Sequence, residues 1–202
     1  MMIVLPMLPL RTQSITNVYV NKLFTDEQCE QIIASARADA WTDGGVGGHG
    51  GVGGVSKVAS VRSVSEQYLP VQSNGFPINQ ILFEINRLNS IGWNFDLTGF
   101  VSDDMPYLMR YAADRKDHYD WHIDVGYNKN ASRKICFSIQ LSNPNDYKGG
   151  DIEFLKVDLS HVNLRERGMI IAFPAFRAHR VLQVTKGLRY VIVGWVHGPA
   201  FK

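Results

Sequence analysis

The stretch KICFSIQLSNPNDYKGGDIEFL, residues 134–155, contains two short apolar runs separated by the turn signals Asn143-Pro144 and Gly149-Gly150. Similar runs stand on both sides of it, as YLMRYA at 107–112, MIIAF at 169–173, HRVLQV at 179–184 and YVIVGWV at 190–196. Many short strands separated by turns are typical of an antiparallel sandwich or barrel. The sequence therefore predicts a mostly β core from about Trp93 onward.

The region before this core carries two helical patterns and one weakly alternating segment at 18–24. Thr25 can cap a helix, and Gln28 completes a capping box with it. The apolar residues of this helix recur at helical spacing as Cys29, Ile32, Ile33 and Ala36. A second helix is expected from Pro77, at the first helical position, to about Asn89. Its apolar stripe consists of Ile78, Ile81, Leu82, Ile85 and Leu88.

These patterns suggest one integrated domain. We expect residues 1–92 to form a support region of helices and a strand, and residues 93–202 to form the β core. The helices would cover one outer face of the sheet.

The composition is that of an ordinary soluble protein. The chain has 202 residues, of which 45% are apolar and 20% charged. A net charge of +2 does not suggest a nucleic-acid partner, and no apolar run approaches the length of a membrane span. Residues 1–10 lack a basic n-region and a small-residue cleavage site, so we expect no signal peptide and a cytoplasmic location. Cys29 and Cys136 form neither a disulfide framework nor a zinc pattern, and we expect both to be small buried residues.

A glycine-rich loop follows Trp41. Eight of the 18 glycines lie between Gly44 and Gly54, without the pattern of a phosphate-binding loop or a dinucleotide fingerprint. The loop is either a plain surface loop or a lid that orders when substrate binds. His49 within it is expected to be an ordinary imidazole with no metal role.

His122-Ile123-Asp124 is an H-x-D triplet, which is weak evidence by itself. Alternate residues of a strand project to the same side, so His122 and Asp124 would point together, and His179 could add a second imidazole from another strand. Two imidazoles and one carboxylate leave three positions open on an octahedral Fe(II) ion. His118, His161 and His197 show no matching partner pattern.

Arg189 lies ten residues after His179, beyond an expected turn at Lys186-Gly187. A strand and its hairpin return would bring this guanidinium near the metal but deeper in the barrel. It could there bind a carboxylate through two parallel hydrogen bonds. A solvated strand residue is the alternative reading, but the apolar surroundings favour a buried partner.

Several segments together resemble the prolyl 4-hydroxylase-like branch of the 2-oxoglutarate/Fe(II) dioxygenases, and the small microbial PKHD-type hydroxylases in particular. The matching pieces cover nearly half the chain in the right order: LMRY at 108–111, HYDWHID at 118–124, LSNPNDYKGGDIEF at 141–154, IIAFPAFRAHRV at 170–181 and VTKGLRYVIVGW at 184–195.

The resemblance implies a double-stranded β-helix of the jelly-roll, cupin-like type with flanking helices. It implies that His122, Asp124 and His179 bind Fe(II) and that Arg189 pairs with the far carboxylate of 2-oxoglutarate. Tyr111 matches a position that contacts this co-substrate. Tyr119 matches the tyrosine three residues before the first ligand, where a packing role is equally open.

The resemblance further implies O₂ as oxidant, ascorbate as reductant, and Gly149-Gly150 as a structural turn. Two departures stand out. The linker RYAADRKDHY lacks the family's glycine, and Ser138 or Gln140 would have to replace a co-substrate contact on the strand at 135–141.

The implied reaction is hydroxylation of an unactivated C–H bond, with peptidyl proline as the first substrate to consider. Free amino acids, other peptides and small metabolites remain alternatives, and the oligomeric state is open. Trp121 and the glycine loop could wall the substrate site or could simply serve packing and linkage. A zinc hydrolase and a silent binding module of the same fold are rival interpretations, against which the complete set of His122, Asp124, His179 and Arg189 argues.

Overall fold

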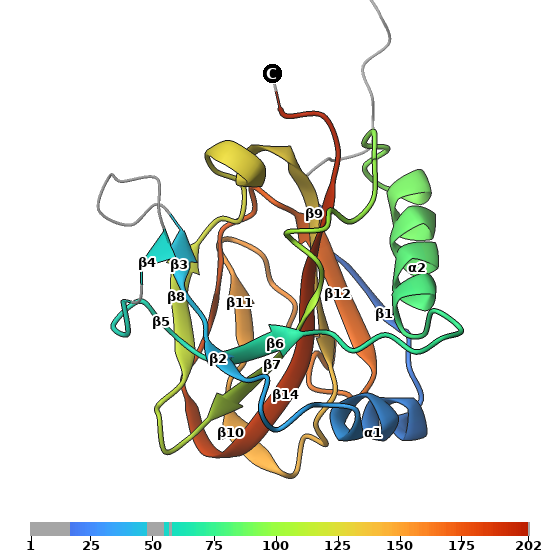
Figure 1. Cartoon of the computed structure of the whole chain (residues 1–202). Coiled ribbons are helices and arrows are strands. Elements are labelled where there is room, and N and C mark those ends of the chain that lie inside the picture. The colour runs from blue at the N-terminus through green and yellow to red at the C-terminus, as the bar shows by residue number, and fades with distance from the viewer. Residues whose placement is uncertain (1–16, 48–54, 57, 202) are drawn as a thin grey trace, which may run out of the picture.

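The computed structural model describes residues 17–47, 55–56 and 58–201 and consists of two antiparallel sheets with helices on one outer side (Figure 1). The eight-stranded main sheet contains, in spatial order, β1 (Tyr19–Lys22), β12 (Met169–Pro174), β9 (Arg133–Gln140), β14 (Val184–His197), β7 (Tyr107–Ala112), β6 (Ser65–Tyr68) and β2 (Thr42–Asp43), and β10 (Tyr147–Gly149) pairs with β14. The four-stranded minor sheet contains β11 (Ile152–Phe154), β13 (His179–Val181), β8 (His118–His122) and β5 (Arg62–Ser63).

The predicted mostly β fold class with flanking helices is confirmed. Three strands of the main sheet, β1, β6 and β2, precede residue 93 and are hydrogen-bonded into the same sheet as the later strands. The boundary between a support region at 1–92 and a core at 93–202 stays a prediction.

Helix α1 (Asp26–Ala34) begins as the sequence predicts. Thr25 Oγ1 accepts a hydrogen bond from the Gln28 backbone N–H, and the Gln28 side chain accepts one from the Thr25 backbone N–H at 2.9 Å. This capping box satisfies two of the N–H groups that a helix start leaves without partners. Cys29 and Ile32 are buried beneath the helix, and Ile33 packs at the edge of the same cluster.

Helix α2 (Ile78–Ile91) starts one residue later and ends two residues later than predicted. Pro77 is the residue before the first helical turn, not the first residue of the helix. The apolar stripe is confirmed, since Ile78, Ile81, Ile85 and Leu88 are buried and Leu82 is partly buried. Both helices lie along the outer side of the main sheet, next to β1 and β12 (Figure 1).

Strand alternation divides the apolar residues between two cores. In β12, Ile170 and Ala172 face the helices, whereas Ile171 and Phe173 belong to the core that includes Phe154 from the minor sheet. In β14, Ile192 and Val196 likewise join the helix side, and Val191 and Trp195 join the inter-sheet side. The space between the sheets is therefore lined by one parity of residues from each main-sheet strand.

The expected turn at Lys186-Gly187 is wrong. Both residues lie inside β14, which is continuous from Val184 to His197. Gly187 has a φ of +71°, which residues with side chains rarely adopt. A Cβ at this position would also clash with the Asp146 carbonyl oxygen. The chain instead changes direction around 182–183, between β13 in the minor sheet and β14 in the main sheet. His179 and Arg189 are therefore on facing sheets and not on one hairpin.

Some predictions fall wholly or partly on residues that the structure does not describe. Residues 1–10, His49 and the glycines from 48 to 54 are among them. The described ends of the glycine-rich segment pair with each other as β3 (Val46–Gly47) and β4 (Val55–Ser56). The remaining element is a 3-10 turn, η1 (Asn128–Ser132). No helix in the described ranges is long and apolar enough to cross a membrane.

The capping box of α1 predicts a measurable stability effect. Thr25→Ala should lower the free energy of unfolding by about 1 kcal/mol, because the Gln28 N–H loses its acceptor at the helix start. Urea unfolding measures the change. Thr25→Ser, which keeps the hydroxyl, serves as the control and should lose much less. Equal losses in the two variants would show that the cap contributes little.

Candidate metal centre

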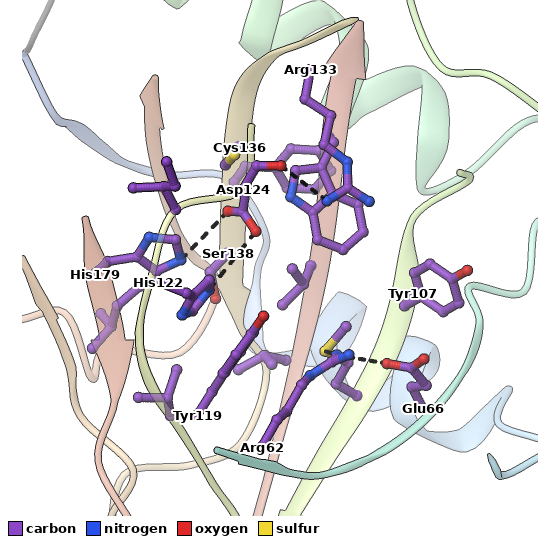
Figure 2. Close-up of a pocket in the computed structure, with 18 of the residues that line it drawn as sticks. Arg62, Glu66, Tyr107, Tyr119, His122, Asp124, Arg133, Cys136, Ser138 and His179 are labelled. Atoms are coloured by element: carbon purple, nitrogen blue, oxygen red, sulfur yellow. Dashed lines mark hydrogen bonds and ion pairs between the residues drawn. The ribbon is translucent and has the colours of Figure 1, made fainter. Parts of the chain in front are cut away.

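The three predicted ligands meet between the ends of two paired strands. His122 is the last residue of β8 and His179 the first of β13, and the register places these two residues directly opposite each other. Asp124 Oδ1 lies 3.8 Å from His122 Nε2, and Asp124 Oδ2 lies 3.5 Å from His179 Nε2. One ligand atom from each residue falls within 4.8 Å of the others. Figure 2 shows the carboxylate of Asp124 pointing at both imidazoles.

Asp124 reaches this position from a loop, not from the strand that the sequence predicts. Strand β8 ends at His122, and the Asp124 backbone N–H donates to the Ala175 carbonyl oxygen at 2.9 Å. Burial opposes ionisation of this carboxyl, but His179, His122 and Arg133 outweigh it and leave the pKa of Asp124 below its ordinary value. The carboxylate form needed by a metal is thus favoured.

Both imidazoles have one nitrogen committed to the backbone. His122 Nδ1 lies 2.7 Å from the Asp120 carbonyl oxygen, and His179 Nδ1 lies 2.9 Å from the Arg177 carbonyl oxygen. A carbonyl accepts only, so Nδ1 carries the proton and the Nε2 lone pair is left for a metal. Burial also lowers the pKa of His122 to about 4, which keeps it neutral near neutral pH.

Aromatic rings hold the two imidazoles in place. The Tyr119 ring is stacked on His122 with centroids 3.4 Å apart, and Phe173 meets the His179 ring edge-on at 4.6 Å. Tyr119 therefore packs against the predicted metal ligand. Its predicted contact with a co-substrate stays a prediction.

Arg189 is buried in the facing main sheet and lines the same pocket as the triad. Its Nε donates to Gln140 Oε1 at 3.0 Å, and its Nη1 has no hydrogen-bond partner among the described residues. Its guanidinium carbon lies 5.6 Å from the centre of the Tyr111 ring. Gly150 makes room for it, since a Cβ there would lie 2.9 Å from Arg189 Cδ. A buried guanidinium with an unused N–H is a suitable partner for an incoming carboxylate.

One pocket joins the triad to Arg189. It is lined by Tyr111, Tyr119, His122, Asp124, Cys136, Ser138, His179, Arg189, Val191, Val193 and Trp195, among others. Ser138 and Gln140 were the two alternatives for a co-substrate contact. Gln140 holds Arg189, and Ser138 lies on the pocket wall next to Val193 of β14. Trp121 is not among the lining residues. It is partly exposed and lies beneath the Arg180 guanidinium, 4.8 Å away.

A buried cluster of charged residues next to Asp124 was not predicted from the sequence. Arg133 forms a double hydrogen bond to Asp104, at 2.7 and 2.8 Å, and His197 lies 3.1 Å from the same carboxylate. Arg133 also contacts the Asp124 carbonyl oxygen and lies over the Trp195 ring at 3.7 Å. Cys136 is buried as expected, and its burial together with the nearby Asp124 carboxylate raises the pKa of its thiol. These residues are too far apart in sequence for any local pattern to reveal the cluster.

The cluster predicts a pH-dependent stability. Burial opposes ionisation of Asp104, but His197 and Arg133 lower its pKa to about 2 from 3.8. A lowered pKa stabilises the fold fully above 3.8, and this contribution is lost as the pH falls to about 2. Asp104→Asn should therefore cost about 2 kcal/mol or more near neutral pH, and the gap to wild type should narrow as the pH falls through this window. Urea unfolding across the pH range measures it.

The neighbouring Asp103 provides the control for that experiment. It is two-thirds exposed and pairs with Lys129 at 3.6 Å, so Asp103→Asn should change stability little. An Asp104→Asn variant as stable as Asp103→Asn near neutral pH would contradict the role given to the cluster.

Comparison with known proteins agrees with this geometry. Residues 107–197 match the family described as the 2OG-Fe(II) oxygenase superfamily. A PKHD-type hydroxylase of Synechococcus sp. (strain CC9902) is 31% identical over 105 residues, which cover 46% of this chain and 47% of the relative. A PKHD-type hydroxylase of Acaryochloris marina is 37% identical over 78 residues, 39% of this chain and 36% of the relative. The chain thus spans about half or less of the length of these curated relatives.

Solved structures show the same fold over most of the chain. A prolyl hydroxylase from Trichoplax adhaerens, solved with a peptide of the hypoxia inducible factor oxygen degradation domain, gives a TM-score of 0.66 at 16% identity and covers 89% of this chain and 83% of that one. A Pseudomonas putida prolyl-4-hydroxylase gives a TM-score of 0.61 at 15% identity, with 90% and 92% covered. At such identities the likeness concerns the fold alone, and it confirms the double-stranded β-helix.

Proposed function

We propose that this chain, whose residues 107–197 match the 2OG-Fe(II) oxygenase superfamily, is a 2-oxoglutarate-dependent dioxygenase that hydroxylates a C–H bond of peptidyl proline. One observation carries the proposal. The three ligand atoms of His122, Asp124 and His179 converge within 4.8 Å in a pocket that is also lined by buried Arg189, whose Nη1 has no hydrogen-bond partner among the described residues. A metal site and a carboxylate site in one pocket are what this chemistry needs.

The described residues fit an Fe(II) ion. His122 and His179 offer Nε2 as ligand atoms because their Nδ1–H groups donate hydrogen bonds to backbone carbonyl oxygens. Asp124 offers a buried carboxylate. Two nitrogens and one oxygen on one side of a metal form the facial set of non-haem iron oxygenases and leave the other side open. Carbonyl hydrogen bonds to the distal ring nitrogens orient the ligands, as second-layer contacts do in many metal sites.

The described residues also fit 2-oxoglutarate. Arg189 would receive the carboxylate remote from the metal, Gln140 keeps the guanidinium in place, and Tyr111 closes the pocket beside it. Gly150 is the position that leaves space for the arginine side chain. A charge-assisted contact in a buried pocket gives both affinity and orientation.

When bound, Fe(II), 2-oxoglutarate and O₂ together supply the oxidising chemistry, and ascorbate would act as reductant. The protein's own residues hold these partners in one place and exclude water. Tyr119, Phe173 and Val191 form apolar walls around the triad and reduce the access of solvent to it. A hydrolase with the same triad would have no use for Arg189, so the oxygenase is the function that the pocket supports best.

Succinate formation tests the proposed function. The purified chain with Fe(II), ascorbate, O₂ and 2-oxoglutarate should form succinate, and a blocked proline-rich peptide should increase the rate. His179→Ala should abolish this activity without changing the circular dichroism spectrum, because the ligand sits at a strand end. A rate of succinate formation that does not change with the peptide would indicate that the substrate is a free amino acid or another small molecule. Full activity of His179→Ala would exclude the triad as the metal-binding site.

Arg189 gives a second and separable prediction. Arg189→Ala should raise the KM for 2-oxoglutarate about 10- to 100-fold, because a charge-assisted hydrogen bond is lost. Steady-state kinetics with varied 2-oxoglutarate measures it, and calorimetric binding of Zn(II) to the same variant shows whether the metal site survives. An unchanged KM with intact metal binding would exclude Arg189 from this role.

A further inference from the structure

A second cavity, which we call the rear cavity, adjoins the triad pocket at Arg189. It has a volume of about 210 Å³. It is lined by Arg189 and Gln140 of the main sheet, by Asp151 and Ile152 at the start of β11, and by the loop residues 162–165, among others. Arg189 and Ile152 are the two residues that line both the rear cavity and the triad pocket. Their side chains therefore form the partition between the metal site and the rear cavity.

The partition is not tightly packed. A space of about 10 Å³ next to Arg189 shares Ser138 with the triad pocket, Leu164 with the rear cavity, and Ile152 with both. A space of this size is at the lower limit for one water molecule. Side chains beside a void lose contacts on that side, so they change rotamer more readily than side chains in a filled core. A rotamer change at Ile152 or Arg189 would join the two cavities.

The loop over the rear cavity is fastened by Arg165. Its Nη1 donates to Asp151 Oδ1 at 2.7 Å and to the Gly149 carbonyl oxygen at 3.0 Å. Its Nη2 donates to the Tyr147 carbonyl oxygen at 3.1 Å, and its guanidinium carbon lies 4.3 Å from the centre of the Tyr147 ring. The side chain of Arg165 is 30% exposed and that of Asp151 is 46% exposed, so this latch lies at the protein surface.

The rest of the loop has few attachments to the barrel. In the described part of the chain, the backbone hydrogen bonds of residues 157–166 join them only to residues of the same stretch, 154–169. Three apolar side chains of the loop, among them Leu164, pack at the edge of the inter-sheet core. Glu166 forms an exposed ion pair with Lys22, which contributes little to stability. A surface segment with so few contacts opens locally at a much lower cost than the whole fold.

The triad pocket itself opens to solvent beside the metal ligands. Ile123 is 51% exposed and the Lys129 side chain is 48% exposed, and both residues line this pocket. A substrate whose C–H bond reacts at the metal has to lie in this opening. The carboxylate site at Arg189 adjoins the rear cavity, so a dicarboxylate bound there has a second way out that does not cross the substrate.

We propose that residues 157–166 form a rear gate, latched by Arg165, through which 2-oxoglutarate enters the site and succinate leaves it. The inference rests on the proposed function and adds to it a route for the two dicarboxylates. Arg189 lines both cavities, so its guanidinium stays within reach of a carboxylate during the passage. Movement of a surface segment that admits a ligand or releases a product sets the turnover rate of many enzymes.

Exchange of the co-substrate without turnover tests the gate. The protein is loaded with Zn(II), which has no redox chemistry. The association and dissociation rates of isotope-labelled 2-oxoglutarate are measured by NMR exchange spectroscopy, and its Kd is measured by calorimetry. A gate changes the barrier to entry and to exit equally, because both use the same path. Both rates then change by the same factor and Kd stays constant, whereas loss of a residue that positions Arg189 changes Kd.

Two gate variants should act in opposite directions. Arg165→Gln removes the ion pair with Asp151 and should raise both rates about threefold or more. Val162→Trp places a large side chain in the rear cavity, keeps the latch, and should lower both rates about threefold or more. The Kd for 2-oxoglutarate should stay within about twofold of the wild-type value in both variants.

Arg180→Gln is the matched control. Arg180 forms a comparable ion pair with Glu153 at 2.7 Å on the minor sheet, and its side chain is 35% exposed. It lines neither the triad pocket nor the rear cavity. This variant should leave both rates and the Kd unchanged.

The outcomes separate this inference from the proposed function. Unchanged rates in both gate variants, a change in Kd that accounts for the change in rate, or an equal change in Arg180→Gln overturns the inference and leaves the proposed function standing. Circular dichroism shows whether each variant is folded, and Val162→Trp decides the question if Arg165→Gln is not. Failure of the Zn(II)-loaded wild-type protein to bind 2-oxoglutarate overturns the proposed function and the inference with it.

Discussion

The pairing of β8 with β13 is the constraint on which the rest of the site depends. It places His122 opposite His179, and the backbone carbonyls of Asp120 and Arg177 then turn both Nε2 atoms toward Asp124. A slip of one residue in this pairing would send one imidazole to the other side of the sheet. The site therefore depends on the local strand register, which shifts between His179 and Val181 while keeping His122 opposite His179.

A second constraint is the balance of buried charge between the sheets. Asp104 pairs with Arg133, and Glu66 pairs with Arg62, within the pocket wall. The positive charge of each arginine is therefore balanced by a carboxylate of the protein. Arg189 is different, because its side chain donates a hydrogen bond to the neutral Gln140 side chain and forms no ion pair with a described acidic residue. Burial of a charge beside a neutral partner is tolerated where a ligand supplies the counter-ion. The contrast distinguishes Arg189, which is proposed to receive a carboxylate, from the two arginines whose charges are balanced within the wall.

Much of the local structure was predictable because short-range physics decides it. The capping box at Thr25, the buried stripe of α2 and the turn at Gly149-Gly150, both with positive φ, follow from the residues themselves. The end of β8 before Asp124 and the continuation of β14 through Gly187 were not predictable. A hydrogen bond from Asp124 to Ala175 and the approach of Gly187 to the Asp146 carbonyl decide them, and both partners come from distant parts of the chain.

The sequence by itself determined the mostly β pattern with its helices, and it predicted the candidate site residues, namely the H-x-D pair with a later histidine and an arginine in an apolar run. These predictions rest on periodicity and on residue spacing, which are local properties of the chain. The tertiary structure alone decided that His179 and Arg189 lie on facing sheets, that Gln140 holds Arg189, and that His179 and Arg189 line one pocket with the rest of the triad. Those relations depend on how two sheets stack and which parity of each strand points inward, and that is set by packing of the whole core.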